Sequence, residues 1–182
     1  MKKVIVICVF ASMSILSVLN AGKNDELWHA AKTGSVEKVD AALKNNFLGF
    51  GGADINYVHK GMTPLMIACA QGHSDVVKDL IEKKAAVLLK KDSRGYTALI
   101  YAIGSGKAGI VGMVIDAAIL EAKKISPEAL NFINARYGGL TPLEHAEENA
   151  EKVSNKDKYK DVIRKLKAAG AIEGKEVEES KS

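Results

Sequence analysis

The chain is poor in cysteine, which excludes a disulfide framework. Among its 182 residues only Cys8 and Cys69 are cysteines. Cys8 lies in an N-terminal run that we expect to be removed, which leaves Cys69 without a partner inside the chain. The fold must therefore be stabilised by packing alone. Cys69 itself lies among small apolar residues, so we expect a buried and inert thiol.

The sequence also lacks a metal-binding cluster and a concentrated basic stripe. Its four histidines lie in separate segments, with no H-x-x-x-H pair, so we expect no zinc site and no other metal. The chain has 26 basic and 22 acidic residues, and without the first 21 residues the balance is 24 to 22. This near-neutral balance argues against nucleic acid as a partner.

No apolar run reaches the roughly 20 residues that a membrane span needs. The longest one, Val4 to Leu19, follows Lys2 and Lys3 and precedes Asn20-Ala21-Gly22. A positive start, an apolar centre and a small residue at the end are typical of a secretory signal peptide. We therefore predict a signal peptide over 1–21 and export from the cytoplasm, to the periplasm or the outside. The alternative is an uncut segment that anchors the protein to a membrane through residues 4–19.

One pattern is repeated along the remainder of the chain. Gly61-Met-Thr-Pro-Leu, Gly95-Tyr-Thr-Ala-Leu and Gly139-Leu-Thr-Pro-Leu are spaced by 34 and 44 residues. After the first two, an apolar run is broken by a glycine turn and followed by a second run at helical spacing. Each unit is therefore predicted to be a helix, a tight turn and a second helix. A lone helical hairpin cannot bury its apolar face, so the units are expected to stack.

A period of about 33 residues with a T-P-L-x-x-A signature resembles the ankyrin repeat family. The resemblance implies an all-α ankyrin solenoid of about four helix-turn-helix repeats joined by β-hairpin-like loops. The predicted domain covers 22–172, with repeats at about 24–56, 61–94, 95–138 and 139–172, and 173–182 is predicted to be a disordered polar tail. Threonine at the start of a first helix can cap it, and proline fits the first helical position.

The sequence departs from the family pattern in several places. Met66, Ile100 and Glu144 replace the histidine that usually follows T-P-L, so its hydrogen bond to the neighbouring turns is expected to be absent. Insertions are expected at 47–52 and about 122–129, with Ser126-Pro127-Glu128 starting a new helix. Asp25 is expected to cap the first helix, and the last helix is expected to cover 160–169.

One motif points to an enzyme instead. The stretch from Gly104 to Gly109 spells G-x-G-x-x-G, a pattern that binds dinucleotides when a strand precedes it and a helix follows. Here it coincides with the turn of a repeat, and Ala108 replaces the Ser or Thr that a P-loop requires. His73-Ser74-Asp75 are adjacent and cannot converge as a triad. We therefore predict no catalytic residue, cofactor or small-molecule substrate, and keep a nucleotide-binding enzyme as the alternative.

The resemblance implies that partners bind the hairpin tips and the first helices. Met62, Tyr96 and Leu140 fill the same variable slot in three repeats, with basic residues nearby, as in a protein-binding hot spot. The alternative is that each only packs on its neighbour. The predicted function is a non-catalytic protein-interaction module with an unidentified protein partner. The candidate binding residues are His59, Lys60, Met62, Ala70, Gln71, Ser93, Arg94, Tyr96, Ser105, Arg136, Tyr137 and Leu140.

Overall fold

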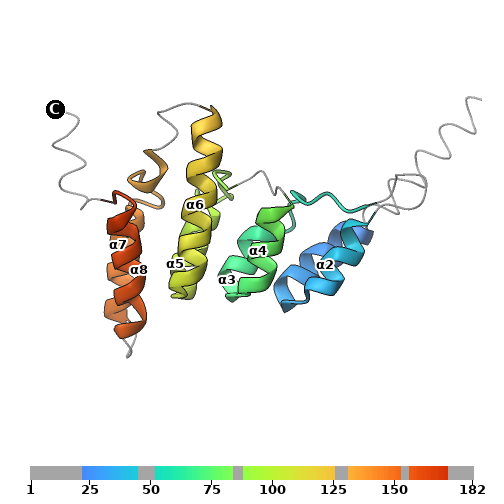
Figure 1. Cartoon of the computed structure of the whole chain (residues 1–182), viewed down its shortest axis with the longest axis horizontal. Helices are drawn as coiled ribbons and strands as arrows, with labels where there is room; N and C mark the ends of the chain where they lie inside the picture. Colours follow the sequence, from blue (N-terminus) through green and yellow to red (C-terminus); the bar gives the residue numbers. More distant parts are fainter. Residues whose placement is uncertain (1–21, 45–51, 84–87, 126–130, 153–155, 172–182) are drawn as a thin grey trace, which may run out of the picture.

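The computed structural model describes residues 22–44, 52–83, 88–125, 131–152 and 156–171. These residues form four pairs of helices that stand side by side in chain order (Figure 1). The first pair is the helix at 22–33 with α2 (Val36–Leu43). The other pairs are α3 (Pro64–Gln71) with α4 (Ser74–Glu82), α5 (Ala98–Ser105) with α6 (Ala108–Ile125), and α7 (Pro142–Lys152) with α8 (Asp157–Ala168).

The helices stack in two rows. The first helices form an inner row, in which α5 packs between α3 and α7, and the second helices form an outer row from α2 through α4 and α6 to α8. Short hairpins join the pairs, with antiparallel bridges between His59 and Met62 and between Tyr137 and Leu140. The predicted all-α solenoid of helix pairs is confirmed.

Buried threonines start the inner helices. The Thr63 hydroxyl accepts a hydrogen bond from the Met66 amide at 3.2 Å, and Pro64 occupies the first turn. Before α7, the Thr141 hydroxyl accepts from the Glu144 amide at 3.2 Å, and the Glu144 carboxylate accepts from the Thr141 amide at 2.7 Å. This second arrangement is a capping box, which satisfies two otherwise unpaired donors.

The turns inside the pairs depend on glycine for two reasons. Gly72 and Gly106 end α3 and α5 with φ of 74° and 66°, a left-handed conformation that costs other residues energy. The next repeat also approaches closely, because the Lys107 ammonium donates to the Gly72 carbonyl at 2.6 Å. A Cβ on Gly72 would lie 2.9 Å from Cε of that lysine. Each turn is thus tied to the turn of its neighbour.

His73 makes the same kind of bond one repeat earlier. Its Nε2 lies 2.9 Å from the Lys32 carbonyl, and since a carbonyl can only accept, Nε2 carries the proton. At the other end of the stack, the Tyr159 hydroxyl donates to the Gly104 carbonyl at 3.1 Å. Side chains from one repeat therefore satisfy carbonyls of the preceding one along the whole edge of the stack.

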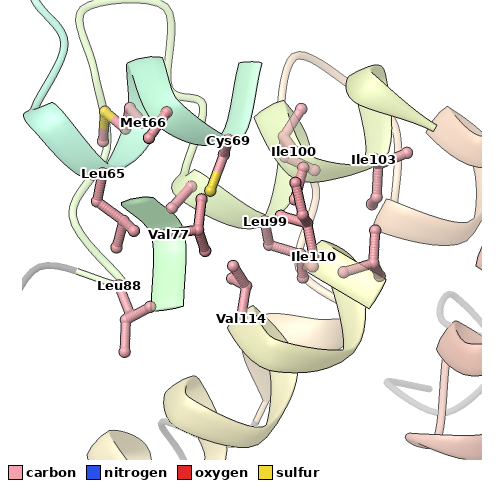
Figure 2. Close-up of a cluster of buried hydrophobic side chains, with 14 of the residues drawn as sticks. Leu65, Met66, Cys69, Val77, Leu88, Leu99, Ile100, Ile103, Ile110 and Val114 are labelled. Carbon is pink, nitrogen blue, oxygen red and sulfur yellow. The ribbon is translucent and has the colours of Figure 1, made fainter. Parts of the chain in front are cut away.

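The core runs through the stack as one continuous cluster. Figure 2 shows Leu65 and Cys69 of α3 close to Val77 of α4, with Leu99 and Ile110 continuing the cluster into the next pair. All five side chains are buried. Burial raises the pKa of the Cys69 thiol above its ordinary value, so this side chain behaves as a small apolar residue.

Several expected boundaries are different in the structure. The first helix starts by residue 22, so Asp25 lies inside it instead of capping it, and α8 starts at Asp157 instead of residue 160. Residues 122–125 continue α6, which reaches past its neighbours in Figure 1. The expected signal peptide at 1–21, the start at 126–128, most of the loop at 47–52 and the tail at 173–182 lie outside the described residues. Within the described parts, no helix combines the length and apolar character needed to cross a membrane.

Gly72→Ala and Gly106→Ala should each lower the free energy of unfolding by about 1–2 kcal/mol, because alanine is strained at positive φ. Gly104→Ala is the matched control. Gly104 lies inside α5 with nothing within 4 Å of an added Cβ, so alanine there should raise stability by about 0.5–1 kcal/mol. Urea denaturation followed by circular dichroism measures all three variants. A Gly72→Ala protein as stable as the wild type would contradict this account of the turn.

Candidate functional site

A hollow of about 570 Å³ lies on the side of the stack formed by the inner helices and the hairpins. We call it the inner groove. Its walls come from α3, α5 and α7 and from the hairpins that precede α5 and α7. The lining residues are Ala70, Arg94, Tyr96, Ile100, Tyr101, Gly104, Gly138, Leu140, His145, Glu148, Asn149 and Lys152.

Arg94 is held in a fixed position at the edge of the inner groove. Its Nη2 donates to the Tyr101 hydroxyl at 2.5 Å, and its Nε lies 3.5 Å from Oδ2 of Asp92. The guanidinium carbon lies 5.3 Å and 5.8 Å from the ring centres of Tyr96 and Tyr101, which are cation–π distances. The Arg94 side chain nevertheless stays 63% exposed. It therefore presents a charge to solvent in a defined orientation.

Asp92 is the buried centre of this arrangement, with a side chain only 3% exposed. Its Oδ1 accepts from the amides of Arg94 and Tyr96 at 2.9 and 2.8 Å, and its Oδ2 accepts from the Tyr101 hydroxyl at 2.6 Å. Burial by itself would raise the pKa of Asp92. The hydrogen bonds and the Arg94 charge outweigh it, and the pKa lies below its ordinary value. The pKa of Tyr101 is raised by burial and by its bond to the Asp92 carboxylate.

The opposite wall is built from α7 and the hairpin before it. His145 Nε2 lies 2.7 Å from the Tyr137 carbonyl and donates to it, while its ring meets that of Tyr96 edge-on at 5.7 Å. About one turn further along α7, Lys152 Nζ forms an ion pair with Glu148 Oε1 at 2.5 Å. Glu144, which stands where the family has histidine, bonds the Thr141 amide, and His145 one position later bonds the hairpin of its own repeat.

The floor of the inner groove is open because small residues leave room there. At Gly104 the space is empty, since an added Cβ would meet nothing within 4 Å. At Gly138 the missing side chain makes room for the ring of Tyr96, which lies directly over it. Half-buried Leu140 supplies apolar surface, together with the 7% of Ile100 that is exposed. The arrangement combines an apolar floor, aromatic rings and one fixed cation, which are the features of surfaces that bind proteins.

The structure brings four of the sequence-predicted residues together in the inner groove, namely Ala70, Arg94, Tyr96 and Leu140. Lys60, Gln71 and Ser93 are exposed, and Met62 is half-buried against the core. Nδ1 of His59 lies 3.1 Å from Oδ1 of Asp25. The Ser105 hydroxyl donates to the Ala102 carbonyl. Arg136 donates to the Gly139 carbonyl at 2.7 Å.

Tyr137 is a correction to that set. It was expected at a hairpin tip, but it is only 3% exposed, and its hydroxyl donates to the Phe132 carbonyl at 3.0 Å. Its side chain belongs to the core, since the hairpin turns it towards the helices. Burial also raises the pKa of Tyr137.

Sequence reasoning missed the wall formed by α7 and the part of α5 beside Arg94. The missed residues follow helical spacing, which puts Ile100, Tyr101 and Gly104 on one face and His145, Glu148, Asn149 and Lys152 on another. That spacing was the available signal. It is obscured because residues 147–152 are mostly polar and charged, which is typical of a solvent-exposed face.

The G-x-G-x-x-G stretch lies where α5 ends and α6 begins, so a helix precedes it instead of the strand that a dinucleotide site requires. Its Lys107 ammonium is bonded to the Gly72 carbonyl. Throughout the described residues there is no group of three or more His, Cys, Asp or Glu side chains that could hold a metal ion.

Comparison with known proteins gives two matches. A family model described as ankyrin repeats (3 copies) matches residues 17–126, more than half of the chain. The chain is also 32% identical over 142 residues to the E3 ubiquitin-protein ligase XBAT33 of Arabidopsis thaliana. That alignment covers 69% of this chain and 26% of the relative, so the chain spans about a quarter of that protein. The fourth helix pair lies beyond the family match and is seen in the structure.

Asp92→Asn should lower the free energy of unfolding by about 1–3 kcal/mol at neutral pH, because it removes a charged acceptor of buried hydrogen bonds. The folded-state pKa lies below that of an unfolded aspartate, about 3.9, so the ionised carboxylate stabilises the fold above that pH. The stabilisation is lost as pH falls through the folded-state pKa. The difference between wild type and variant should therefore shrink below about pH 4.

Urea denaturation across this pH range measures the effect. Asp116→Asn is the matched control, since Asp116 is exposed on α6, and it should cause no comparable loss. Equal stability of Asp92→Asn and wild type at neutral pH would show that the network does not hold the hairpin.

Proposed function

Because the chain belongs to the ankyrin repeat family, we propose that it is a non-catalytic module that binds a protein partner in its inner groove. Ankyrin repeats indicate a protein-interaction module, and this family shares one scaffold among unrelated partners. The binding surface must therefore come from what is particular to this chain. In the inner groove, half-buried aromatic and apolar side chains meet the exposed charges of Arg94 and Lys152.

The observation that carries the proposal is the fixed but exposed position of Arg94. Interfaces obtain most of their binding energy from a few aromatic and arginine side chains. Side chains that are already ordered lose less conformational entropy when a partner binds. Arg94 is ordered by Asp92, Tyr96 and Tyr101, and yet remains 63% exposed. A partner can thus be bound without first ordering this part of the surface.

We also place this interaction outside the cytoplasm. The support is the sequence at the N-terminus, where Lys2 and Lys3 precede the apolar run Val4 to Leu19 and the small residue Ala21 follows it. Amino-terminal sequencing of the protein from its source tests this placement. A mature chain that begins near residue 22 supports export, and a chain that retains residues 1–21 favours the membrane-anchored alternative. The ligase activity in the relative's name is not part of the proposal, because the similarity covers only 26% of that relative.

Gly104→Leu should block the inner groove without weakening the fold. Leucine favours a helix more than glycine does, and an added Cβ meets nothing within 4 Å. Proteins retained by the immobilised chain from its own compartment, identified by mass spectrometry, should fall by about tenfold or more for this variant, a loss of at least about 1.4 kcal/mol.

Gly109→Leu is the matched control. It makes the same change at an exposed glycine on α6, in the outer row, where an added Cβ also meets nothing. It should retain the partner at the wild-type level. A Gly104→Leu protein that stays folded and binds as the wild type does would refute the inner groove as the binding site.

A further inference from the structure

The three hairpins that precede α3, α5 and α7 carry charge of almost one sign, and the second and third of them border the inner groove. They cover residues 56–61, 90–96 and 135–140, and we call them the hairpin row. The row contains one acidic residue, Asp92, whose side chain is 3% exposed. Its basic residues are Lys60, Lys90, Lys91, Arg94 and Arg136, all of them exposed. A chain that is close to neutral overall therefore presents a basic edge beside its groove.

Arg94 connects this basic edge to the apolar floor. Its contacts with Asp92 and Tyr101 use Nε and Nη2, which leaves N–H groups of the exposed guanidinium to face a ligand. Arginine pairs well with carboxylates because its planar fork matches their geometry. Beside it, Ile100 and Leu140 offer apolar surface, and a hollow of about 570 Å³ has room for large side chains.

We propose that the inner groove and the hairpin row bind an acidic protein segment that carries a large apolar side chain between its carboxylates. The apolar side chain enters the groove over Ile100 and Leu140, and a neighbouring carboxylate pairs with Arg94. Further carboxylates face the lysines of the row. This assignment rests on the proposed function and names the chemistry of its partner.

An acidic protein segment fits this surface better than nucleic acid does. The groove is lined by Glu148 as well as by Arg94, and Lys152 lowers the pKa of Glu148, which keeps that carboxylate charged. A phosphate chain following the groove would meet this charge. A protein segment can instead offer a backbone amide there. The apolar floor also favours a side chain over a phosphate backbone.

The test uses the naturally processed chain and three capped, fluorescently labelled peptides. The first peptide has glutamates on both sides of a central Leu-Phe pair. The second has glutamine in place of each glutamate, and the third has alanine in place of Leu-Phe. Fluorescence anisotropy should show binding of the first and about tenfold or weaker binding of the other two. The affinity for the first peptide should fall as salt is added.

Three protein variants locate the interaction. Arg94→Gln should weaken binding of the acidic peptide by about tenfold or more. The double variant Lys60→Gln with Lys90→Gln should weaken it severalfold while leaving the Asp92 network intact. Lys78→Gln is the matched control, because Lys78 is 67% exposed on α4 in the outer row, and it should bind as the wild type does.

The outcomes separate the two proposals. Equal affinity for the glutamate and glutamine peptides, or no loss in either Arg94→Gln or the double variant, would overturn the acidic-partner assignment. So would tighter binding, with the same dependence on Arg94, of single-stranded oligothymidine or of phosphatidylserine vesicles. If the acidic peptide fails while Gly104→Leu still abolishes partner capture, only the chemistry of the partner is wrong. If capture survives Gly104→Leu, the groove itself is not the site.

Discussion

The whole stack depends on a close approach between the turns of successive repeats. A left-handed glycine ends α3 and α5, and its missing side chain allows a residue of the next repeat to reach a carbonyl of the turn. This contact sets the spacing of the helix pairs at one edge, while the core sets it in the middle. Helices α3, α5 and α7 are thereby held side by side, and their shared surface becomes a groove.

The hairpins at the other edge are fixed by different chemistry. The Asp92 carboxylate accepts hydrogen bonds from two amides and a hydroxyl, and these bonds hold the hairpin before α5. The same bonds orient Tyr101 and Arg94. One buried charge therefore shapes the loop and also positions the exposed cation beside the groove. Asp92 is buried and holds the hairpin, while Arg94 beside it is exposed to solvent.

Much of the fold was predictable from the sequence, because it follows from local rules. The glycine in the turns of the first three pairs, the threonine before a helix and the period of the apolar residues are set by neighbours within a few positions. The last wall of the groove was not predictable in this way. Tyr137 occurs at an expected tip and yet is buried, and its carbonyl accepts a hydrogen bond from His145, which the sequence did not indicate. Which side of a hairpin a ring occupies depends on the neighbouring repeat, and residue spacing does not encode it. Counting charges likewise missed the basic hairpin row, because acidic residues elsewhere balance it.

The position of the groove near one end of the described stack has a thermodynamic consequence. In a solenoid each repeat is stabilised by its neighbours, and α7 and α8 contact another described pair on one side only. Such a pair opens more readily than the interior, and its opening removes His145, Glu148 and Lys152 from the site. A partner bound in the groove as we propose would span α5 and α7, and its binding free energy would favour the closed state of that pair. Binding in the groove and folding of the fourth helix pair are therefore thermodynamically coupled, so that each favours the other.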